Sequence, residues 1–277
     1  MVGFGGRALS AQDDAKYLNS PETELFKKGQ ILYGLYQARE AIKKEKQVIV
    51  SEGYMDVIAL HQFGFENAVA VLGTAMTNDH VRRLKRYTDQ ILLVFDADRA
   101  GQSAAVRSTE TLSQNDLRGR VLCLPRGEDP DSFLRQQGQD AWTKLVTNEA
   151  LVPFDFMMKQ ARERNPGPSI ESKSAVGREL LQFIAGLPRA MDRSLHLGLL
   201  AAQLGIPQES LARDLNALRG KREGVVKPLG QGMKSHASTA ADAAKRGLVV
   251  LVLNSDSASR IGGERIRALS SLIDDTE

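Results

Sequence analysis

Acidic side chains stand at the ends of two apolar runs in the first half of the chain. Glu52 closes the run that begins at Val48, and Asp96 and Asp98 follow directly on the run 91–95. If both runs are strands of one open α/β sheet, their carboxyl ends share a crevice, and the three carboxylates converge there. Carboxylate oxygens are hard ligands that suit Mg²⁺ or Mn²⁺, ions that are completed by water and substrate phosphates. The pattern therefore predicts a metal site for phosphoryl transfer.

Each of these acids also has a plainer explanation. Asp and Glu are ordinary turn and helix-capping residues at strand ends, so none of the three predicts a metal site by itself. Glycines accompany them: Gly53 follows the glutamate, Gly73 ends the next apolar run, and Gly101 follows the two aspartates. Glycine allows tight turns and a close approach of the backbone to phosphate. The combination of acids and glycines favours the metal site over the plainer explanation.

Apolar runs and amphipathic segments alternate between Gln47 and Leu124, which is typical of a parallel sheet covered by helices. The predicted strands are 48–52, 68–72, 91–95 and 119–124. The predicted helices are 54–63, 78–87 with Thr77 or Asn78 as its cap, and 99–112. The run 91–95 is uninterrupted and apolar, as in strands that are buried on both faces. The fold class is therefore α/β, with a mostly parallel sheet and flanking helices.

The second half of the chain has a different pattern. After Trp142, apolar residues recur at helical spacing as far as Arg219, which predicts an all-α helical subdomain. The segment 201–215 resembles a helix-turn-helix with Gly205 in the turn, but its second helix is not markedly basic, so a packing role is favoured over DNA reading. Residues 220–239 are rich in Gly, Lys and Ser and predict a linker. Beyond it, 240–253 and 261–273 could form one or two helices.

Composition narrows the class of protein. The 277 residues are 42% hydrophobic, which is enough for one sizeable core and a smaller unit. The formal net charge is only +3, so a nucleic-acid surface must come from local clustering of basic residues. Cys123 is the single cysteine, which excludes an internal disulfide and a zinc site built from several thiolates and fits a reducing compartment. The longest apolar run, Leu248 to Leu253, is too short to span a bilayer, so no membrane association is expected.

Three segments of the first half carry a resemblance to a known family. They are EGYMDVIALHQFG from Glu52, AVAVLGTAMTNDHVRRLKRYTDQILLVFDADRAG from Ala68 and GEDPDSFLRQQG from Gly127. These segments resemble the TOPRIM region of bacterial DnaG-type DNA primases almost word for word. Upstream, GFGGRALSAQDDAKYLNSPETELFKKGQILYGLYQAR from Gly3 looks like the family stretch that precedes TOPRIM, and the helical segments up to Arg219 are similar to the family's helical subdomain in character.

The resemblance implies roles for six acids. Three match the TOPRIM glutamate and the DxD pair, which coordinate metal and are the catalytic residues: Glu52, Asp96 and Asp98. Three more match outer acids of the same cluster: Asp56, Asp129 and Asp131. Six carboxylates around one crevice repel each other, so the cluster needs bound cations or raised pKa values. For Asp56, a solvated helix face is an equal alternative. The family usually has glycine between the two aspartates, and Ala97 in this chain puts the local turn in doubt.

Basic residues supply the other half of the expected chemistry, because primer synthesis must hold a template backbone and a triphosphate. Arg7, Lys16 and Lys28 match family residues that face the nucleotide and the template. Without the resemblance, each would be read as solvated surface. A denser basic helix follows Asn78, with Arg82, Arg83, Lys85 and Arg86. It is either a phosphate-binding face or a charged exterior, and the exterior is favoured.

The resemblance also sets the expected domain organisation. Residues 1–45 are the rear part of the N-terminal RNA-polymerase subdomain, 46–140 the TOPRIM metal-binding domain, 141–219 the helical subdomain and 220–239 the linker. Residues 240–277 are expected to begin a truncated C-terminal helicase-binding region. The zinc ribbon of the family is expected to be absent from this chain, since one cysteine cannot build it.

The function implied is that of a DNA primase: template-directed synthesis of short RNA primers on single-stranded DNA by metal-dependent nucleotidyl transfer, with Mg²⁺ or Mn²⁺. Its expected partners are the single-stranded template, ribonucleoside triphosphates and the replicative helicase, in the bacterial cytoplasm at the nucleoid-associated replication fork. Strand cleavage of the topoisomerase type would use the same acids, but no tyrosine is identified as its nucleophile. A second alternative is an incomplete primase fragment or TOPRIM module that binds metal and nucleic acid without efficient synthesis.

Overall fold

The computed structural model describes residues 3–8, 17–96, 99–115, 117–223 and 248–253. The chain divides into two compact units, one made of residues 1–27 with 234–277 and the other of residues 28–233. In the first unit, β1 (Gly3–Ala8) pairs antiparallel with β2 (Tyr17–Asn19) and with β7 (Leu248–Leu253). This small sheet therefore joins the two ends of the chain.

The strand β7 corrects the prediction of a helix across 240–253. Its sequence, LVVLVL, contains three β-branched valines, whose restricted side-chain rotation favours a strand over a helix. Each of its residues pairs with one of β1, from Gly3 opposite Leu253 to Ala8 opposite Leu248. The second predicted helix, 261–273, and most of the predicted linker lie outside the described residues.

The second unit contains the predicted parallel sheet. Its four strands are β3 (Val48–Ser51), β4 (Ala68–Ala70), β5 (Gln90–Phe95) and β6 (Arg118–Cys123). They lie in the order β4-β3-β5-β6, and every neighbouring pair is parallel. The chain goes from β3 to β4 on one side and then crosses to β5 on the other side, so the direction of winding reverses between β3 and β5. The α/β fold class predicted from the sequence is confirmed.

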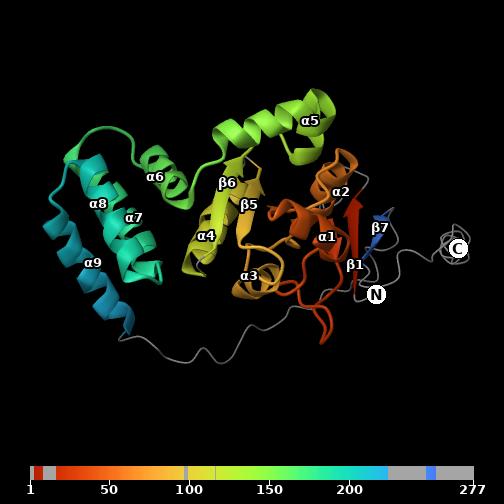
Figure 1. The fold of residues 1–277 in the computed structure, drawn as a ribbon, viewed down its shortest axis with the longest axis horizontal. Helices are drawn as coiled ribbons and strands as arrows, with labels where there is room; N and C mark the ends of the chain where they lie inside the picture. Colours follow the sequence, from red (N-terminus) through yellow and green to blue (C-terminus); the bar gives the residue numbers. More distant parts are fainter. Residues whose placement is uncertain (1–2, 9–16, 97–98, 116, 224–247, 254–277) are drawn as a thin grey trace, which may run out of the picture. The chain divides into compact units, whose positions relative to one another are not determined.

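Five helices cover the two faces of this sheet (Figure 1). They are α1 (Leu35–Glu45), α2 (Tyr54–Gln62), α3 (Asn78–Leu84), α4 (Arg99–Gln114) and α5 (Pro130–Glu149). Side chains alternate along each strand, as in any pleated sheet. On β5, Ile91 and Leu93 belong to the apolar cluster that contains residues of α1, α3 and α4, whereas Leu92 and Val94 belong to the cluster of α2 and α5. Both faces of the sheet are therefore buried.

Four further helices form the second half of this unit: α6 (Pro153–Arg164), α7 (Ile170–Gly186), α8 (Ala190–Leu204) and α9 (Gln208–Glu223). Gly205 ends α8 with φ +66°, a left-handed conformation that glycine adopts without strain. Leu211 and Leu215 of α9 are buried, which agrees with a packing role for the predicted helix-turn-helix. Within the described part of the chain, no helix combines the length and the apolar character needed to cross a membrane.

Two of the expected domain boundaries lie next to residues that are buried in the core of the sheet, and the boundaries stay a prediction. The boundary at 45/46 separates α1 from the sheet, yet Ala38 and Ile42 are fully buried in the sheet's core. The boundary at 140/141 falls inside α5, and Trp142 is 1% exposed in the cluster on the other face of the sheet. Helical spacing alone could not show this, because an amphipathic helix can pack on a sheet as well as on other helices.

Candidate functional site

The carboxyl ends of β3 and β5 bring the first two predicted acids together. The two strands are direct neighbours, with Val50 opposite Leu93, and Glu52 and Asp96 each follow their strand at the same edge. The backbone N–H of Asp96 donates a hydrogen bond to Glu52 Oε1 at 3.3 Å. This edge is also where the winding of the sheet reverses, which is the usual place of the ligand crevice in open α/β sheets.

Gly101, in the first turn of α4, lies against both of these acids. A Cβ atom at this position would come within 2.4 Å of the Asp96 carbonyl oxygen and within 2.9 Å of Glu52 Oε1. The φ angle of Gly101 is not positive, so its backbone conformation does not require glycine. Glycine is required because neighbouring atoms leave no room for a side chain. The sequence motif contained this glycine, but its spacing alone did not show that it makes room for the two acids.

Asp56 is the third acid at this edge, and it is buried, with 8% of its surface exposed. It occupies the first turn of α2, where Asp56 Oδ2 accepts a hydrogen bond from the Gly53 N–H at 2.9 Å. Burial and, after it, the charges of Asp96, Asp129 and Glu52 raise the pKa of its carboxyl to about 7, and the hydrogen bond from the Gly53 N–H opposes this rise. The alternative of a solvated helix face is wrong for Asp56, because the helix turns this side chain inward.

The two acids of the EDPD segment differ in their surroundings. Asp129 caps the N-terminus of α5, where its Oδ1 accepts a hydrogen bond from the Ser132 N–H at 2.8 Å, and its charge acts on Asp56. Asp131 forms an ion pair with Arg135 one turn further along the same helix, at 2.7 Å. Asp129 therefore joins the group around Asp56, while Asp131 is engaged by its own helix.

The arrangement suits a hard divalent cation in its chemistry. Besides burial, repulsion by the neighbouring carboxylates raises the pKa of Asp56. A cation bound among these carboxylates would relieve the repulsion. Within the described residues, no group of three or more His, Cys, Asp or Glu side chains is close enough to hold a metal ion as it stands. Asp98, one of the three inner acids, lies outside those residues, as does Ala97. The metal-binding roles of the six acids stay a prediction.

The predicted nucleotide and template residues are distributed over both units. Arg7 lies in β1 opposite Tyr17, in the unit that does not contain the acids, and Lys16 lies outside the described residues. Lys28 belongs to the unit with the acids and is half-buried, and its backbone carbonyl bonds the ring of His80 at 2.9 Å. The described residues therefore do not test whether these three side chains act at one site, and their roles also stay a prediction.

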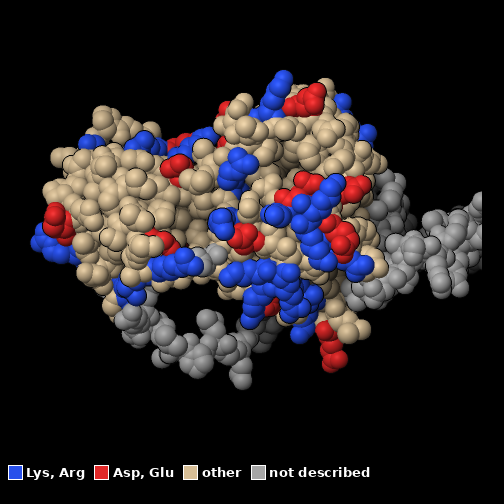
Figure 2. Space-filling model, viewed as in Figure 1, with Lys and Arg blue, Asp and Glu red and all other residues tan. Residues whose placement is uncertain are grey.

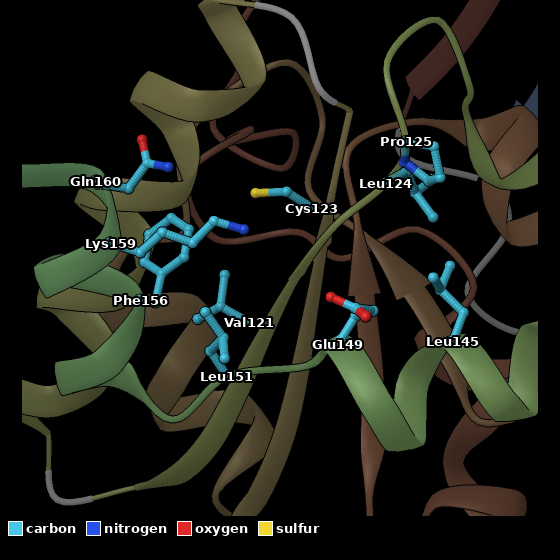
Figure 3. Close-up of a pocket in the computed structure, with 10 residues that line it drawn as sticks. All are labelled: Val121, Cys123, Leu124, Pro125, Leu145, Glu149, Leu151, Phe156, Lys159 and Gln160. Atoms are coloured by element: carbon cyan, nitrogen blue, oxygen red, sulfur yellow. The ribbon is translucent and has the colours of Figure 1, made fainter. Parts of the chain in front are cut away.

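A cavity of about 430 Å³ opens at the carboxyl end of β6 (Figure 3). Cys123 lines it and is paired in register with Phe95, so the cavity lies one strand away from Asp96. Burial raises the pKa of the Cys123 thiol to about 11, so the sulfur stays protonated at neutral pH and is a poor nucleophile. Figure 3 shows Lys159 of α6 pointing into the cavity. No spacing in the sequence marked this lysine.

Three family models match consecutive parts of the chain. A model of the N-terminal domain of the DNA primase catalytic core matches residues 1–39, a Toprim-like model matches 49–134, and a model of the DnaB-helicase binding domain of primase matches 154–209. A solved domain of the Pseudomonas aeruginosa DNA primase is 40% identical, with a TM-score of 0.70, over 77% of this chain and 67% of that one. The chain belongs to the bacterial DnaG-type primases. A solved DnaG catalytic core is similar as well, at 37% identity and a TM-score of 0.66, over 76% of this chain and 68% of that one.

The match to whole primases is partial. The DNA primase of Pseudomonas putida is 45% identical over 198 residues, which are 70% of this chain and 30% of that protein. The DNA primase of Halalkalibacterium halodurans is 37% identical over 214 residues, 77% of this chain and 36% of that protein. The primase chain thus spans about a third of the length of these curated relatives. The helicase-binding match covers α6 to α8, in the predicted helical subdomain, and the expected role of residues 240–277 stays a prediction.

The raised pKa of Asp56 predicts that the metal-free primase chain loses stability as pH rises. The folded protein binds a proton with a pKa of about 7, well above the ordinary value of an unfolded aspartate, so protonation favours folding below that pH. Between pH 5 and 8 the free energy of unfolding should fall by about 2–3 kcal/mol from this group. Asp56→Asn, which retains an acceptor for the Gly53 N–H, should remove that part of the slope. Urea unfolding in EDTA measures it, and an unchanged slope in the variant would contradict the assignment.

Gly101→Ala should disturb the acid edge. The added Cβ cannot fit beside the Asp96 carbonyl without a backbone shift, so we expect a loss of about 1–3 kcal/mol in the free energy of unfolding. The affinity for Mn²⁺ should also fall, because the shift moves the backbone that carries Asp96. Gly220→Ala in α9, which meets open space, is the matched control and should be neutral or stabilising. Titration calorimetry with Mn²⁺ and thermal unfolding measure both effects, and wild-type values in Gly101→Ala would refute the steric role of this glycine.

Proposed function

We propose that this chain takes part in template-directed synthesis of RNA primers on single-stranded DNA, as a nucleotidyltransferase of the primase type. The observation that carries the proposal is the hydrogen-bonded pair of Glu52 and Asp96 at the edge where β3 and β5 end. That edge lies within the residues that match the Toprim-like model, and the chain is a DnaG-type primase by sequence. The proposal agrees with the general rule that open α/β sheets bind ligands at the edge where the winding reverses, which here is the edge with Glu52 and Asp96.

Toprim primases generally use a divalent metal, and the residues of this chain fit one. Glu52, Asp96 and Asp98 would be the inner ligands and the catalytic residues, with Asp56 and Asp129 around them. Asp131 would have to exchange its ion pair with Arg135 to join them. A Mg²⁺ or Mn²⁺ ion bound there would stabilise the attacking and leaving oxygens of the transferred phosphoryl group. The hydrogen bond from the Asp96 N–H to Glu52 Oε1 would orient the Glu52 carboxylate toward such an ion.

The partners proposed for this activity are a single-stranded template and ribonucleoside triphosphates. A solved relative, 36% identical to this chain with a TM-score of 0.66, is a DnaG primase catalytic domain bound to ssDNA. Arg7, Lys16 and Lys28 are the basic residues proposed to contact phosphate groups of the template or nucleotide. Such an activity would serve the replication fork in the bacterial cytoplasm.

A replicative helicase of the DnaB type is the third proposed partner. The residues that match the helicase-binding model include α8, on which Met191, Leu195 and Leu199 are 66%, 62% and 52% exposed. Their spacing of four residues places them on one face of the helix. Three large apolar side chains in a row are uncommon on a free surface and are typical of a surface that binds a partner helix or groove. We assign this α8 face to the helicase contact.

Removal of the acid pair tests the proposed chemistry. Asp96→Asn/Asp98→Asn should reduce primer synthesis by about 100-fold or more, since the loss of metal contacts removes several kcal/mol of transition-state stabilisation. The assay uses a single-stranded template, ribonucleotides and Mg²⁺ or Mn²⁺, with Mn²⁺ binding measured in parallel. Asp140→Asn/Asp214→Asn removes two exposed acids elsewhere and should leave both values unchanged.

The outcomes of that assay separate the competing functions. Unchanged Mn²⁺ affinity in Asp96→Asn/Asp98→Asn would refute the metal site itself. A wild-type chain that binds Mn²⁺ and DNA through these acids but makes no primers would instead be a metal-binding primase module, the alternative drawn from the sequence.

The α8 face is tested by Leu195→Asp. A charge in the centre of the face should weaken binding to a DnaB-type helicase by at least about tenfold, or 1.4 kcal/mol. Leu25, which is 77% exposed and lies outside the residues that match the helicase-binding model, provides the control Leu25→Asp. Surface plasmon resonance with immobilised helicase measures the affinity, and equal affinities of the two variants would contradict the assignment. Thermal unfolding of both variants checks that each remains folded.

A further inference from the structure

The amino edge of the sheet, opposite the acids, carries four basic residues that we call the amino-edge cluster: Lys46, Arg83, Lys85 and Arg86. Lys46 ends α1 directly before β3, and the other three stand at the end of α3, shortly before β5. All four are exposed. Figure 2 shows lysine and arginine side chains gathered over α3 on this side of the molecule.

Hydrogen bonds join the chain segments that carry this cluster to each other and to the end of α4. The Thr88 hydroxyl, directly after α3, donates to the Lys46 carbonyl at 2.7 Å. Lys85 Nζ donates to the carbonyl of Asn115, at the end of α4, at 2.8 Å. The ends of three helices thus meet at the amino edge, and their basic residues form one surface although they come from distant parts of the sequence.

Several acids on the elements that carry this surface have ion-pair partners. Four ion pairs lie on α1, on α3 and between the starts of β5 and β6: Lys43 with Glu40, Lys44 with Glu45, Arg82 with Asp79, and Arg118 with Asp89. Within the described residues, none of the four members of the cluster forms an ion pair. The neighbouring cations are balanced by acids, and the cluster itself contributes four positive charges without a counter-charge in this part of the structure.

Favourable interaction with helix dipoles is the competing explanation. A cation near the C-terminus of α1 or α3 stabilises the helix by a few tenths of a kcal/mol. Lys43, Lys44 and Arg82 stand in the last turns of these helices, together with Arg83 of the cluster. The dipoles therefore account for Arg83 but do not require the other three cations of the cluster. Repulsion among four close positive charges costs stability unless an anion is bound.

We propose that the amino-edge cluster binds the phosphate backbone of duplex nucleic acid. Binding of a single strand typically uses exposed aromatic side chains as stacking platforms. Tyr87, the aromatic residue next to the cluster, is partly buried against the core, so among the described residues the cluster offers charge without such a platform. That chemistry fits a duplex, whose bases are already stacked and whose phosphates face outward.

The geometry separates this surface from the acid edge. The strand β5 has six residues, so its two ends are about 20 Å apart. A duplex on the amino-edge cluster would leave the edge with Glu52 and Asp96 accessible. The inference therefore goes beyond the proposed function, because binding at this surface requires neither metal nor nucleotidyl transfer.

The test compares two triple variants of the full chain. Lys46→Asn/Arg83→Gln/Arg86→Gln removes three charges of the cluster but keeps the Lys85 hydrogen bond, and asparagine tolerates the left-handed φ of +52° at position 46. Lys144→Gln/Lys173→Gln/Arg178→Gln removes three exposed charges elsewhere and is the matched control. Fluorescence anisotropy with a labelled 20-base-pair DNA duplex, at several salt concentrations and in EDTA, measures affinity.

We expect the cluster variant to bind the duplex at least about tenfold more weakly and to show a salt slope that is smaller by about two to three, near 0.9 for each lost phosphate contact. The control variant should bind like the wild type. Equal duplex binding by the cluster variant and the control would overturn the proposal. A loss confined to the single strand of the same sequence would overturn the assignment to a duplex, and a loss of thermal stability with unchanged binding would show that the cluster only serves the helix dipoles.

Discussion

The parallel pairing of β3 with β5 is the constraint on which the acid edge depends. The two strands are separated in the sequence by α2, β4 and α3, and each is followed directly by a predicted metal ligand. Pairing them side by side, at the point where the winding reverses, brings Glu52 within hydrogen-bonding distance of the Asp96 backbone. A shift of this pair by one residue would turn one acid away from the crevice and would also exchange the buried faces of the strand. The two apolar layers therefore fix the register that positions the acids.

The same edge opposes the stability of the fold. Burial and the neighbouring acids raise the pKa of Asp56. The absence of a side chain at Gly101 leaves room for the Asp96 carbonyl and the Glu52 carboxylate. Sites of this kind concentrate charge at some cost in stability, because the charge is what recognises the ligand. The amino edge has the opposite sign, with acids paired and four cations left over. The sheet thus separates negative from positive charge along the direction of its strands.

Much of this arrangement could be predicted from the sequence. The four strands of the parallel sheet and the helices between them agree closely with the apolar runs, because the runs are long and uninterrupted and carry acids or glycines at their ends. Thr77 caps α3 as expected, with its hydroxyl bonding the His80 N–H. The inward position of Asp56 was not predictable, since the helical spacing of one acid does not show which face of the helix packs on the sheet.

Other features depend on contacts between distant residues. The strand β7 was missed because a short apolar run is compatible with either a helix or a strand until its partner β1 is known. Trp142 was placed with the helical subdomain because its neighbours have helical spacing. Its ring instead packs against Phe65 and Phe133, in the apolar cluster that covers one face of the sheet. The steric role of Gly101 likewise appears only when the carbonyl of Asp96 and the carboxylate of Glu52 are seen beside it.

The helices α6 to α9 share one apolar core with the sheet, and this has a consequence for how the unit comes apart. Phe156 and Leu180 belong to the same cluster as Leu93 and Phe95, which lie in the last three residues of β5 before Asp96. Residues 28–233 should therefore melt in one cooperative transition, in which the helices do not unfold ahead of the strands. A partner that binds only the folded form of α8 would then also stabilise the distant acid edge against unfolding. This effect follows from mass action and needs no conformational change between the two sites.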